Sequence, residues 1–300
     1  MNIAFATSEE YRGLTEDDRR AVEALAERGA TVRATVWNDP TVVWSEFDLI
    51  VVRSTWDYHR HAEQFREWIA SLENTGAPLW NPPALLRWNM EKTYLRELER
   101  AGVRTVPTAW LSRGAETELG ALLEERGWHD VVVKPVISAA ANRTHRIGRA
   151  DTASANSQVA ASLEIGDVMV QPFIHEIQTR GEWSLIFIDG EFSHSVRKRP
   201  MSGDFRVQAH LGGDATTEAA GTDVIASARK VLDAVEFPWL YARVDGIETV
   251  DGFVLLELEM LEPSLYFVHT DSGAGRFADS IINRAGSRTG HLAAYEGPAG

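Results

Sequence analysis

Residues 1–88 alternate short apolar runs with amphipathic segments, and this alternation restricts the fold more than any other feature of the chain. The apolar run at residues 2–7 is followed by a helical pattern over residues 15–29, which a threonine can cap and a glycine can end. Two further apolar runs and a second helical pattern, HAEQFREWIASLENTG, continue the order. Strands that alternate with helices pair in parallel, so the sequence predicts an N-terminal parallel α/β domain over residues 1–88.

The charge balance and the absence of cysteine exclude several function classes. The chain has 300 residues, 44 acidic and 30 basic, and its formal charge of −14 repels a phosphate backbone, so we expect no nucleic-acid partner. Without cysteine there is no disulfide, thiol nucleophile or cysteine-bound zinc. The N-terminus lacks a signal-peptide pattern, and no run approaches the roughly 20 apolar residues of a membrane span. We therefore expect a soluble cytoplasmic protein without a membrane partner.

A loop rich in aromatic and basic side chains follows the apolar run LIVV. In parallel α/β sheets, ligands bind beyond the carboxyl ends of the strands, and the segment RSTWDYH at residues 53–59 occupies such a position. It is therefore a candidate for the substrate side of a site. The alternative is a surface loop that its arginine and aromatic rings anchor without any ligand.

The rest of the chain mixes helices and strands. Helical patterns cover residues 91–102, 114–127 and about 217–235. The run DVVVKP predicts a buried strand in which Lys134 adjoins three valines, and burying an ammonium there is costly unless it reaches an anion or water. Asp-Gly pairs at residues 189–190 and 251–252 predict two hairpins. Only the last ten residues are typical of a loose tail.

The stretch GFVLLELEMLEPSLYF places Glu257 and Glu259 on one face of a predicted strand and apolar side chains on the other. Alternation alone is typical of a solvated sheet face. A two-residue turn in the second Asp-Gly hairpin would point Asp245 to the opposite face. A three-residue loop would pair Asp245 with Glu257 and Arg243 with Glu259. The three carboxylates would then repel each other unless cations lie among them, and such hard oxygen ligands suit Mg²⁺.

Several motifs, taken in chain order, resemble the ATP-grasp superfamily on its glutathione-synthetase-like side. They are MEKTYLRELERAGVRTVPT, VVVKP, MVQPFI, GEWSLIFIDGEFSHSVRK, DFRVQAHLGG, YARVD and LLELEMLEPS. The resemblance covers roughly residues 89–270. It implies a two-subdomain ATP-grasp fold of the α+β type, with residues 89–165 as the first subdomain and residues 166–300 as the second, which carries the metal and phosphate site. It also implies that ATP lies between their sheets with two Mg²⁺ ions, or Mn²⁺ in their place.

The resemblance assigns nucleotide and metal residues by their places in these motifs. The ATP-binding set is Lys92, Lys134, Ser138, Gln171, Phe173, Ile174, Glu182 and Lys198, and the metal set is Asp245, Glu257 and Glu259. The lysines match phosphate contacts, the segment around Phe173 matches the hinge that reads adenine, and Glu182 matches the residue that holds the ribose hydroxyls. Many members carry asparagine in place of Glu259.

The loop expected to cover the phosphates departs from the family pattern, because SAAANRTHR contains no glycine. Small side chains still permit close approach of the backbone to a phosphate. The side chains of Asn142, Arg143, Thr144 and Arg146 are further candidates to donate hydrogen bonds to phosphate oxygens.

Within the superfamily, the chain looks most like a group of small ligases. This group is related to the cyclo-ligase that forms cycloserine from O-ureido-D-serine in antibiotic biosynthesis. The resemblance lies in the length of the chain and in the segments RSTWDY and ELEMLEPSLYF. This implies an amino acid derivative whose carboxylate becomes an acyl phosphate that a nitrogen of the same molecule attacks. Intermolecular ligation of the glutathione synthetase type is the first alternative, and phosphotransfer to a hydroxyl is the second. We expect a monomer or a homodimer.

The same resemblance suggests which side chains act on the substrate. Arg206 and Arg243 are the catalytic candidates, for binding the carboxylate or its tetrahedral oxyanion, and the alternative for each is a structural ion pair. The substrate-binding set is Arg53, Ser54, Thr55, Tyr58 and Ser264.

Overall fold

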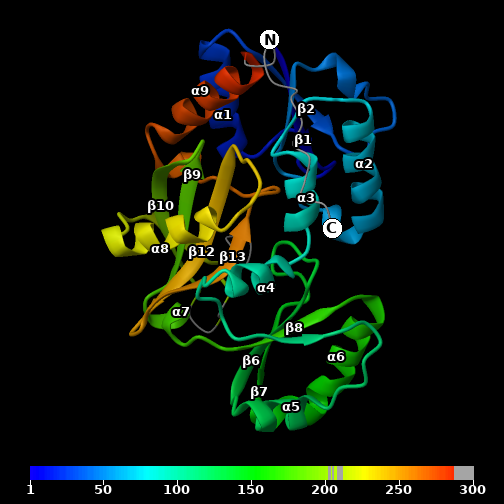
Figure 1. Cartoon of the computed structure of the whole chain (residues 1–300), viewed down its shortest axis with the longest axis vertical. Helices are drawn as coiled ribbons and strands as arrows, with labels where there is room; N and C mark the ends of the chain where they lie inside the picture. The colour runs from blue at the N-terminus through cyan, green and yellow to red at the C-terminus, as the bar shows by residue number, and fades with distance from the viewer. Residues whose placement is uncertain (202–203, 205, 208–211, 287–300) are drawn as a thin grey trace.

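The computed structural model describes residues 1–201, 204, 206, 207 and 212–286 (Figure 1). In this part of the chain the strands form three sheets. Part of the motif DFRVQAHLGG and the expected C-terminal tail lie outside the described residues. As far as the described residues go, none of the helices combines the length and hydropathy needed to span a lipid bilayer.

The N-terminal sheet has the strand order β2-β1-β3-β4, and all neighbouring strands are parallel, as the sequence predicts. Its strands are β1 (Asn2–Thr7), β2 (Thr31–Val36), β3 (Leu49–Val52) and β4 (Leu79–Trp80). Helices α1 (Glu16–Glu27) and α9 (Gly273–Gly286) cover one face, and α2 (Ala62–Asn74) covers the other. Because strand side chains alternate, Ile3 packs toward α1 and Ala4 packs toward α2.

The middle sheet is antiparallel and has the order β5-β8-β6-β7. Its strands are β5 (Ala109–Leu111), β6 (Asp130–Pro135), β7 (His145–Gly148) and β8 (Val168–Pro172), and its helices are α5 (Leu119–Arg126) and α6 (Thr152–Ile165). Val131 and Val133 pack against the two helices in one apolar core. The alternation of a strand therefore points Val132 and Lys134 to the opposite face of β6, where both line a cavity.

The third sheet is antiparallel and has the order β11-β10-β9-β12-β13. Its strands are β9 (Glu182–Ile188), β10 (Glu191–Arg199), β11 (Asp214–Thr217), β12 (Tyr241–Thr249) and β13 (Gly252–Glu259). Helix α8 (Thr222–Asp233) packs against Leu185 and Val244 on one face. The helix predicted from about residue 217 begins at Thr222 instead, because the residues before it pair with β10 as the edge strand β11.

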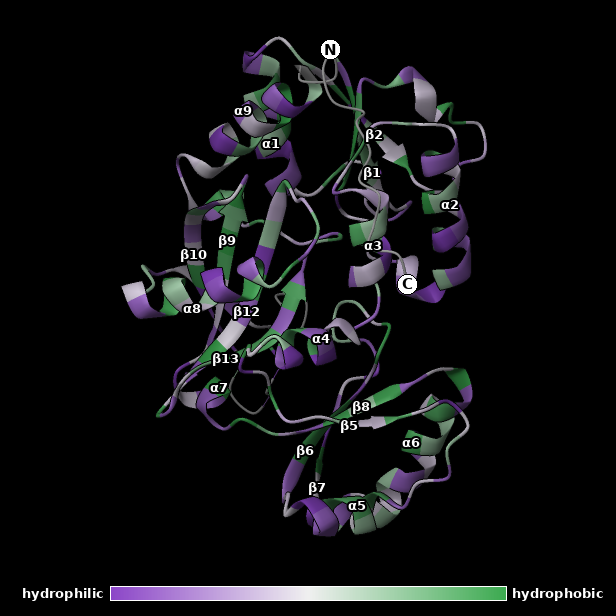
Figure 2. Ribbon diagram, in the orientation of Figure 1, coloured by the Kyte–Doolittle hydropathy of each residue, from purple (hydrophilic) through white to green (hydrophobic). Residues whose placement is uncertain are grey.

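The remaining elements are short. They are α3 (Pro83–Asn89), α4 (Tyr94–Arg100), α7 (Glu176–Thr179) and the 3-10 turns Trp44–Glu46, Tyr58–Arg60, Arg149–Asp151 and Phe267–His269. Figure 1 shows α4 between the third sheet and the middle sheet. Figure 2 shows hydrophobic residues concentrated along β8 and β9, whereas the helices at the surface carry both colours. The sheets therefore supply the cores and the helices cover them.

The β9–β10 hairpin turns where the sequence predicts. Asp189 and Gly190 form its two-residue connection, and both have a positive φ, of 49° and 86°. Asp-Gly favours this turn because glycine, and aspartate to a lesser degree, tolerates the left-handed conformation.

The β12–β13 hairpin reaches the predicted pairing by a different route. Neither turn considered from the sequence is present: Thr249 pairs with Gly252, so the turn residues are Val250 and Asp251. The register shifts further along, where Leu256 forms a bulge in β13. This extra residue restores the pairing of Asp245 with Glu257 and of Arg243 with Glu259.

Candidate active site

A cavity of about 450 Å³ is lined by residues from all three regions of the fold. Strands of the middle and third sheets supply two walls, and the loops that follow β1 and β3 supply a third. Most of the predicted site residues line it: Tyr58, Lys92, Lys134, Ser138, Gln171, Phe173, Ile174, Glu182, Lys198, Arg206, Arg243, Asp245, Glu257, Glu259 and Ser264. The structure therefore brings together side chains that are far apart in the sequence.

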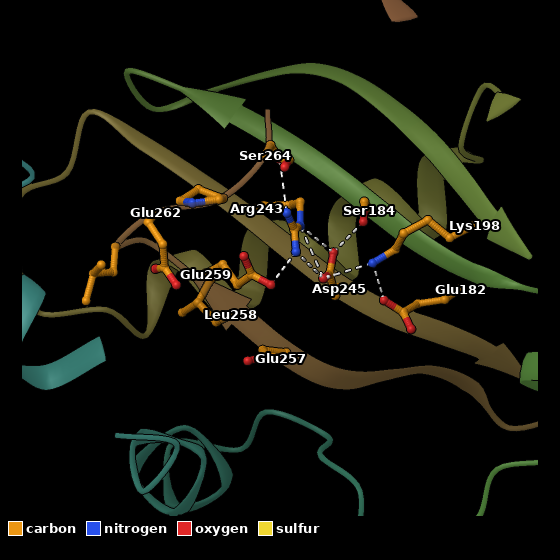
Figure 3. A network of polar contacts seen from close by, with 12 residues as sticks. Glu182, Ser184, Lys198, Arg243, Asp245, Glu257, Leu258, Glu259, Glu262 and Ser264 are labelled. Carbon is orange, nitrogen blue, oxygen red and sulfur yellow. Dashed lines mark hydrogen bonds and ion pairs between the residues drawn. The ribbon is translucent and has the colours of Figure 1, made fainter. Parts of the chain in front are cut away.

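One face of the third sheet carries a row of charged side chains, which we call the ion-pair row (Figure 3). Its cross-strand neighbours are Lys198 with Glu182, Asp245 with Glu257, and Arg243 with Glu259. Side chains of the other face pack under α8, so the same strands carry an apolar core on one side and charges on the other.

Asp245 lies at the centre of the row. Its carboxylate accepts hydrogen bonds from Arg243 Nη2 at 2.9 Å and from Lys198 Nζ at 3.1 Å, and also from the hydroxyl of Ser184. Burial favours the protonated acid, but the two cations and the hydroxyl outweigh it and lower the pKa of Asp245 to about 2. Asp245 is therefore an ionised, buried carboxylate with its oxygens already occupied.

Lys198 joins Asp245 to Glu182 in an ion pair with each. Burial would lower the pKa of the Lys198 ammonium, yet the two carboxylates raise it. Burial raises the pKa of Glu182, which Lys198 only partly offsets. The proposed phosphate lysine and the proposed ribose-binding glutamate thus contact each other, and a nucleotide would separate them.

The two glutamates of β13 face different cations. Glu257 lies 3.1 Å from Lys92 Nζ, and although burial opposes it, Lys92 and Lys134 lower the pKa of Glu257. Glu259 pairs with Arg243. Burial, together with the negative charges of Glu257 and Asp245, outweighs that partner and raises the pKa of Glu259 to about 7.

Lys92 and Lys134 approach the cavity from separate elements, and only Lys92 is anchored. Its ammonium donates to the carbonyl of Ser138 at 2.7 Å and to the Ser138 hydroxyl at 3.2 Å. Lys134 makes neither a hydrogen bond nor an ion pair with any residue that the structure describes, and burial lowers its pKa. A buried ammonium without a partner that faces a cavity is suited to an anionic ligand.

The loop SAAANRTHR lacks glycine, but its backbone adopts the conformation that glycine usually provides. Ala140, Ala141 and Arg143 have φ of 52°, 56° and 53°, the left-handed region that glycine usually occupies. The alanines and Thr144 line the cavity. Arg146 instead pairs with an aspartate of β6 at 2.6 Å and lies 3.8 Å over the Phe173 ring, so it supports the loop from the side.

The segment after β8 forms the apolar part of the cavity. Phe173 and Ile174 line it. The Phe173 amide donates to a carbonyl of β6 at 2.8 Å, whereas the Ile174 amide has no partner among the described residues. The Gln171 side chain donates to Thr108 at 2.9 Å and so stays in the wall. This edge of the cavity therefore combines apolar side chains with one backbone donor that has no described partner.

Arg53, Ser54 and Thr55 do not line the cavity, in contrast to their predicted substrate role. All three are buried, and Arg53 Nε donates to Asp18 at 2.8 Å. The Ser54 hydroxyl donates to the same aspartate at 3.0 Å. The chain immediately after β3 therefore turns inward, and only Trp56 and Tyr58 of this loop reach the cavity.

The two candidate catalytic arginines both form ion pairs. Arg243 contacts Asp245 and Glu259 and donates to the Ser264 carbonyl at 3.0 Å. Arg206 contacts Asp204 at 2.8 Å at the cavity margin. A role of either arginine toward a substrate requires these partners to be shared or exchanged.

Glu262 is a cavity residue that the sequence reading missed. It is 8% exposed, and its carboxylate makes no hydrogen bond or ion pair with any other described residue. Burial and the neighbouring Glu259 raise the pKa of Glu262 to about 8. The available signal was the acidic residue of MLEPS, which directly follows a buried run.

The oxygen donors of the row fit a hard cation such as Mg²⁺ by type and by position. Asp245, Glu257 and Glu259 face the cavity from two adjacent strands. In the described part of the chain, however, no three carboxylate or imidazole groups form a metal cluster by themselves. The carboxylates therefore suit an ion that a ligand's phosphate oxygens also hold, not a preformed all-protein site.

Two family models match the chain. One describes the N-terminal domain of D-cycloserine synthetase DcsG and matches residues 3–81. The other describes the ATP-grasp domain of prokaryotic glutathione synthetase and matches residues 92–253. Together they cover most of the chain, with residues 82–91 between them and Lys92 at the start of the second.

Known proteins agree with both matches. The cycloserine biosynthesis protein DcsG of Streptomyces lavendulae is 32% identical over 283 residues, which span 88% of this chain and 92% of DcsG. A crystal structure of D-cycloserine synthetase DcsG has a TM-score of 0.87 and 28% identity, covering 95% of this chain and all of that one. The D-alanine–D-alanine ligase of Bacillus anthracis, complexed with ATP, shares the fold with a TM-score of 0.69 at 15% identity, covering 95% and 97% of the two chains.

Proposed function

Because the chain belongs to the ATP-grasp carbon–nitrogen ligases that include DcsG and the prokaryotic glutathione synthetases, we propose that it uses ATP to close a ring within an amino acid derivative. The proposed reaction activates the substrate's carboxylate as an acyl phosphate, which a nitrogen of the same molecule then attacks. Formation of D-cycloserine from O-ureido-D-serine is the specific instance; there the attacking nitrogen also carries a carbamoyl group, so water must cleave that nitrogen–carbon bond and release carbon dioxide and ammonia.

The observation that carries the proposal is the arrangement of lysines and carboxylates around one cavity. Lys92, Lys134 and Lys198 come from three separate elements and face the row that contains Asp245 and Glu257. Three cations suit a triphosphate, which cannot bind a chain of charge −14 without local positive charge. The similarity to DcsG extends through the N-terminal region as well, which favours ring closure over other ligations.

In the proposed mechanism, Lys92 and Lys134 hold the phosphates while the substrate carboxylate attacks the γ-phosphorus and ADP leaves. Arg243 then stabilises the oxyanion that forms when the substrate nitrogen attacks the acyl carbon, and inorganic phosphate leaves. Arg206 is placed at the margin to contact the substrate carboxylate or the phosphate. To do so, each arginine must release a carboxylate of the protein and bind a carboxylate or phosphate group of the ligand instead.

Asp245, Glu257 and Glu259 are the residues that would hold Mg²⁺ in this proposal. When bound, Mg²⁺ neutralises the phosphate oxygens and so lowers the charge repulsion against an attacking carboxylate. We infer two ions, because the row offers three carboxylates spread over two strands; Mn²⁺ suits the same oxygen donors.

The loop over the phosphates and the aromatic wall have a protective role in the proposal. An acyl phosphate is hydrolysed by water, so the site must be closed during transfer. Ala140 and Ala141 allow the loop backbone to approach the phosphates, and Tyr58 seals the substrate side.

The cellular setting belongs to the same proposal. We infer a cytoplasmic enzyme with one small-molecule substrate, no nucleic-acid partner and either a monomeric or a homodimeric state. The charge of −14 supports the absence of a nucleic-acid partner.

Intermolecular ligation of a carboxylate with an amine is the second candidate. The match of residues 92–253 to the glutathione synthetase model supports it, because the same ATP site serves both reactions. The two differ in where the nitrogen originates.

The test is a coupled measurement of ADP release with O-ureido-D-serine, followed by mass analysis of the product. Ring closure predicts ADP release with this single substrate and no increase when free amines are added. An absolute requirement for an added amine would establish intermolecular ligation instead. A product that retains phosphate would overturn both ligase reactions in favour of phosphotransfer.

A further inference from the structure

Glu262 is a carboxylate without a partner at a fixed place in the cavity. Its side chain is more than nine-tenths buried and lines the cavity, yet no other described residue donates to its carboxylate, and its own backbone amide is the donor beside it. Figure 3 shows it on the chain that follows β13, near Glu259. Burying a carboxylate without a cationic partner is unfavourable, so this position calls for a ligand with positive charge.

The backbone that carries Glu262 is held by three consecutive carbonyl contacts. Trp56 Nε1 donates to the Glu262 carbonyl at 2.9 Å, and Arg53 Nη2 donates to the Pro263 carbonyl at 3.1 Å. Arg243 donates to the Ser264 carbonyl at 3.0 Å. The N-terminal region and β12 thus fix this segment from both sides. Arg53, which does not reach the cavity, has a positioning role here.

The surroundings of Glu262 favour an ammonium group. Tyr11, Trp56 and Tyr58 line the same cavity, and aromatic faces attract organic cations. The nearby protein cations are already committed, since Lys92 contacts Ser138 and Glu257 while Arg243 contacts Asp245 and Glu259. A hard metal ion needs several oxygen donors, whereas Tyr11, Trp56 and Tyr58 offer aromatic faces, so an organic cation suits this position better than a metal ion.

We propose that Glu262 binds the ammonium group of the substrate, with Tyr11, Trp56 and Tyr58 enclosing that cation. This inference rests on the proposed function and adds the residue that recognises the free, protonated amino group of the substrate. An ionised Glu262 also keeps that amino group protonated.

The experiment compares O-ureido-D-serine with its analogue in which hydrogen replaces the α-amino group, and measures kcat and KM for ADP release. We expect the wild-type protein to prefer the amino compound by about 100-fold in kcat/KM, mostly through KM. Glu262→Gln keeps the shape and removes the charge. It should lower kcat/KM for the amino compound by about 30-fold or more, leave the analogue within about threefold, and leave the KM for ATP unchanged.

Two further variants make the result specific. Glu262→Asp keeps the charge on a shorter stem and should retain much of the preference. Glu191→Gln removes an exposed glutamate that pairs with Arg229 on the surface, and it should behave like the wild type. Thermal unfolding of each variant reports whether the fold is retained.

The outcomes separate this inference from the proposed function. An equal kcat/KM for both compounds in the wild type, or an undiminished preference in Glu262→Gln, would overturn the role of Glu262 while carboxylate activation stands. Failure of the wild type to release ADP with either compound would overturn the proposed function, and the inference with it.

Discussion

The cavity has two walls that balance charge in different ways. In the ion-pair row, Lys198 and Arg243 each contact two carboxylates, and Lys92 contacts Glu257. On the adjoining wall, which we call the Glu262 wall (Tyr11, Trp56, Tyr58 and Glu262), no other described residue pairs with the carboxylate of Glu262 or the phenol of Tyr58. The charged side chains of the ion-pair row have partners within the protein, whereas the carboxylate of the Glu262 wall has no charged partner in the described part of the chain.

This difference indicates what each wall does when a ligand arrives. In the row, the desolvation cost of each buried charge is offset by a neighbour, so a nucleotide must exchange one partner for another. In the Glu262 wall, the raised pKa of Glu262, about 8, follows from burial without a cation. A cationic ligand there adds a partner and replaces none. Lys134 is the exception near the row, since it too lacks a partner.

The largest expected effect comes from Glu257→Gln in the row. The change removes the partner of Lys92 and a proposed Mg²⁺ ligand, so ADP release should fall by at least about 10³-fold. The thermal midpoint should fall less than that of Asp245→Asn, because Lys92 keeps its hydrogen bonds to Ser138. Turnover within tenfold of the wild type would remove Glu257 from the proposed catalytic set.

A stability measurement sharpens the contrast between the walls. Asp245→Asn leaves the buried cations Arg243 and Lys198 short of a counter-charge, and it should lower the free energy of unfolding by about 3–5 kcal/mol. Glu262→Gln removes no ion pair and should not lower it. Urea unfolding at pH 7 measures both. Equal losses for the two variants would show that the walls do not differ in the way described.

Lys134→Met tests the role of the one lysine near the ion-pair row whose ammonium has no partner among the described residues. The substitution keeps an apolar stem and removes an ammonium that the protein itself does not use, so stability should not fall. The affinity for ATP should fall by more than about tenfold, because the charge acts in a partly closed cavity where it is weakly screened. Calorimetric titration with ATP measures the affinity. An unchanged affinity would place the phosphates elsewhere.

The smallest expected effect is a pH dependence of stability in the ligand-free protein. The pKa of Glu262 is raised to about 8 in the folded state from its ordinary 4.5, so the folded protein binds this proton more tightly. The stability from that proton is fully present below pH 4.5 and is lost as the pH rises through about 8. The thermal midpoint should therefore fall by a few degrees between pH 6 and pH 9.

Glu262→Gln is the matched variant for that measurement, because the amide cannot lose a proton in this range. Its decrease from pH 6 to pH 9 should be smaller than that of the wild type. Some decrease should persist, since the pKa of Glu259 is also raised, to about 7. An identical decrease in both proteins would contradict the assignment to Glu262.

Much of the fold follows from local pattern. The parallel N-terminal sheet follows from alternating strands and helices, and α1 begins at its predicted cap, where the Thr15 hydroxyl accepts from the Asp18 amide at 3.0 Å. The Asp189-Gly190 turn follows from residues that tolerate a positive φ. These features depend on neighbours a few residues apart, which the sequence displays directly.

The site was predictable only where a motif has a fixed place on a strand. Lys134 faces the cavity because two buried valines alternate with it, and Glu257 faces it because of the same period. The loop after β3 shows the limit. Its segment RSTWDYH predicts a ligand site as a whole, yet Arg53 turns inward to Asp18 while Tyr58 reaches the cavity.

The sequence by itself determined the order of the elements, their faces and the residue types that an ATP-dependent ligase needs, because those depend on periodicity and on motifs read along the chain. Tertiary structure alone decided which charges satisfy one another. The bulge at Leu256 places Asp245 beside Glu257, and contacts from Arg53, Trp56 and Arg243 fix the backbone of Glu262. Electrostatic balance depends on distances between segments far apart in sequence, and those distances exist only once the three sheets have packed together.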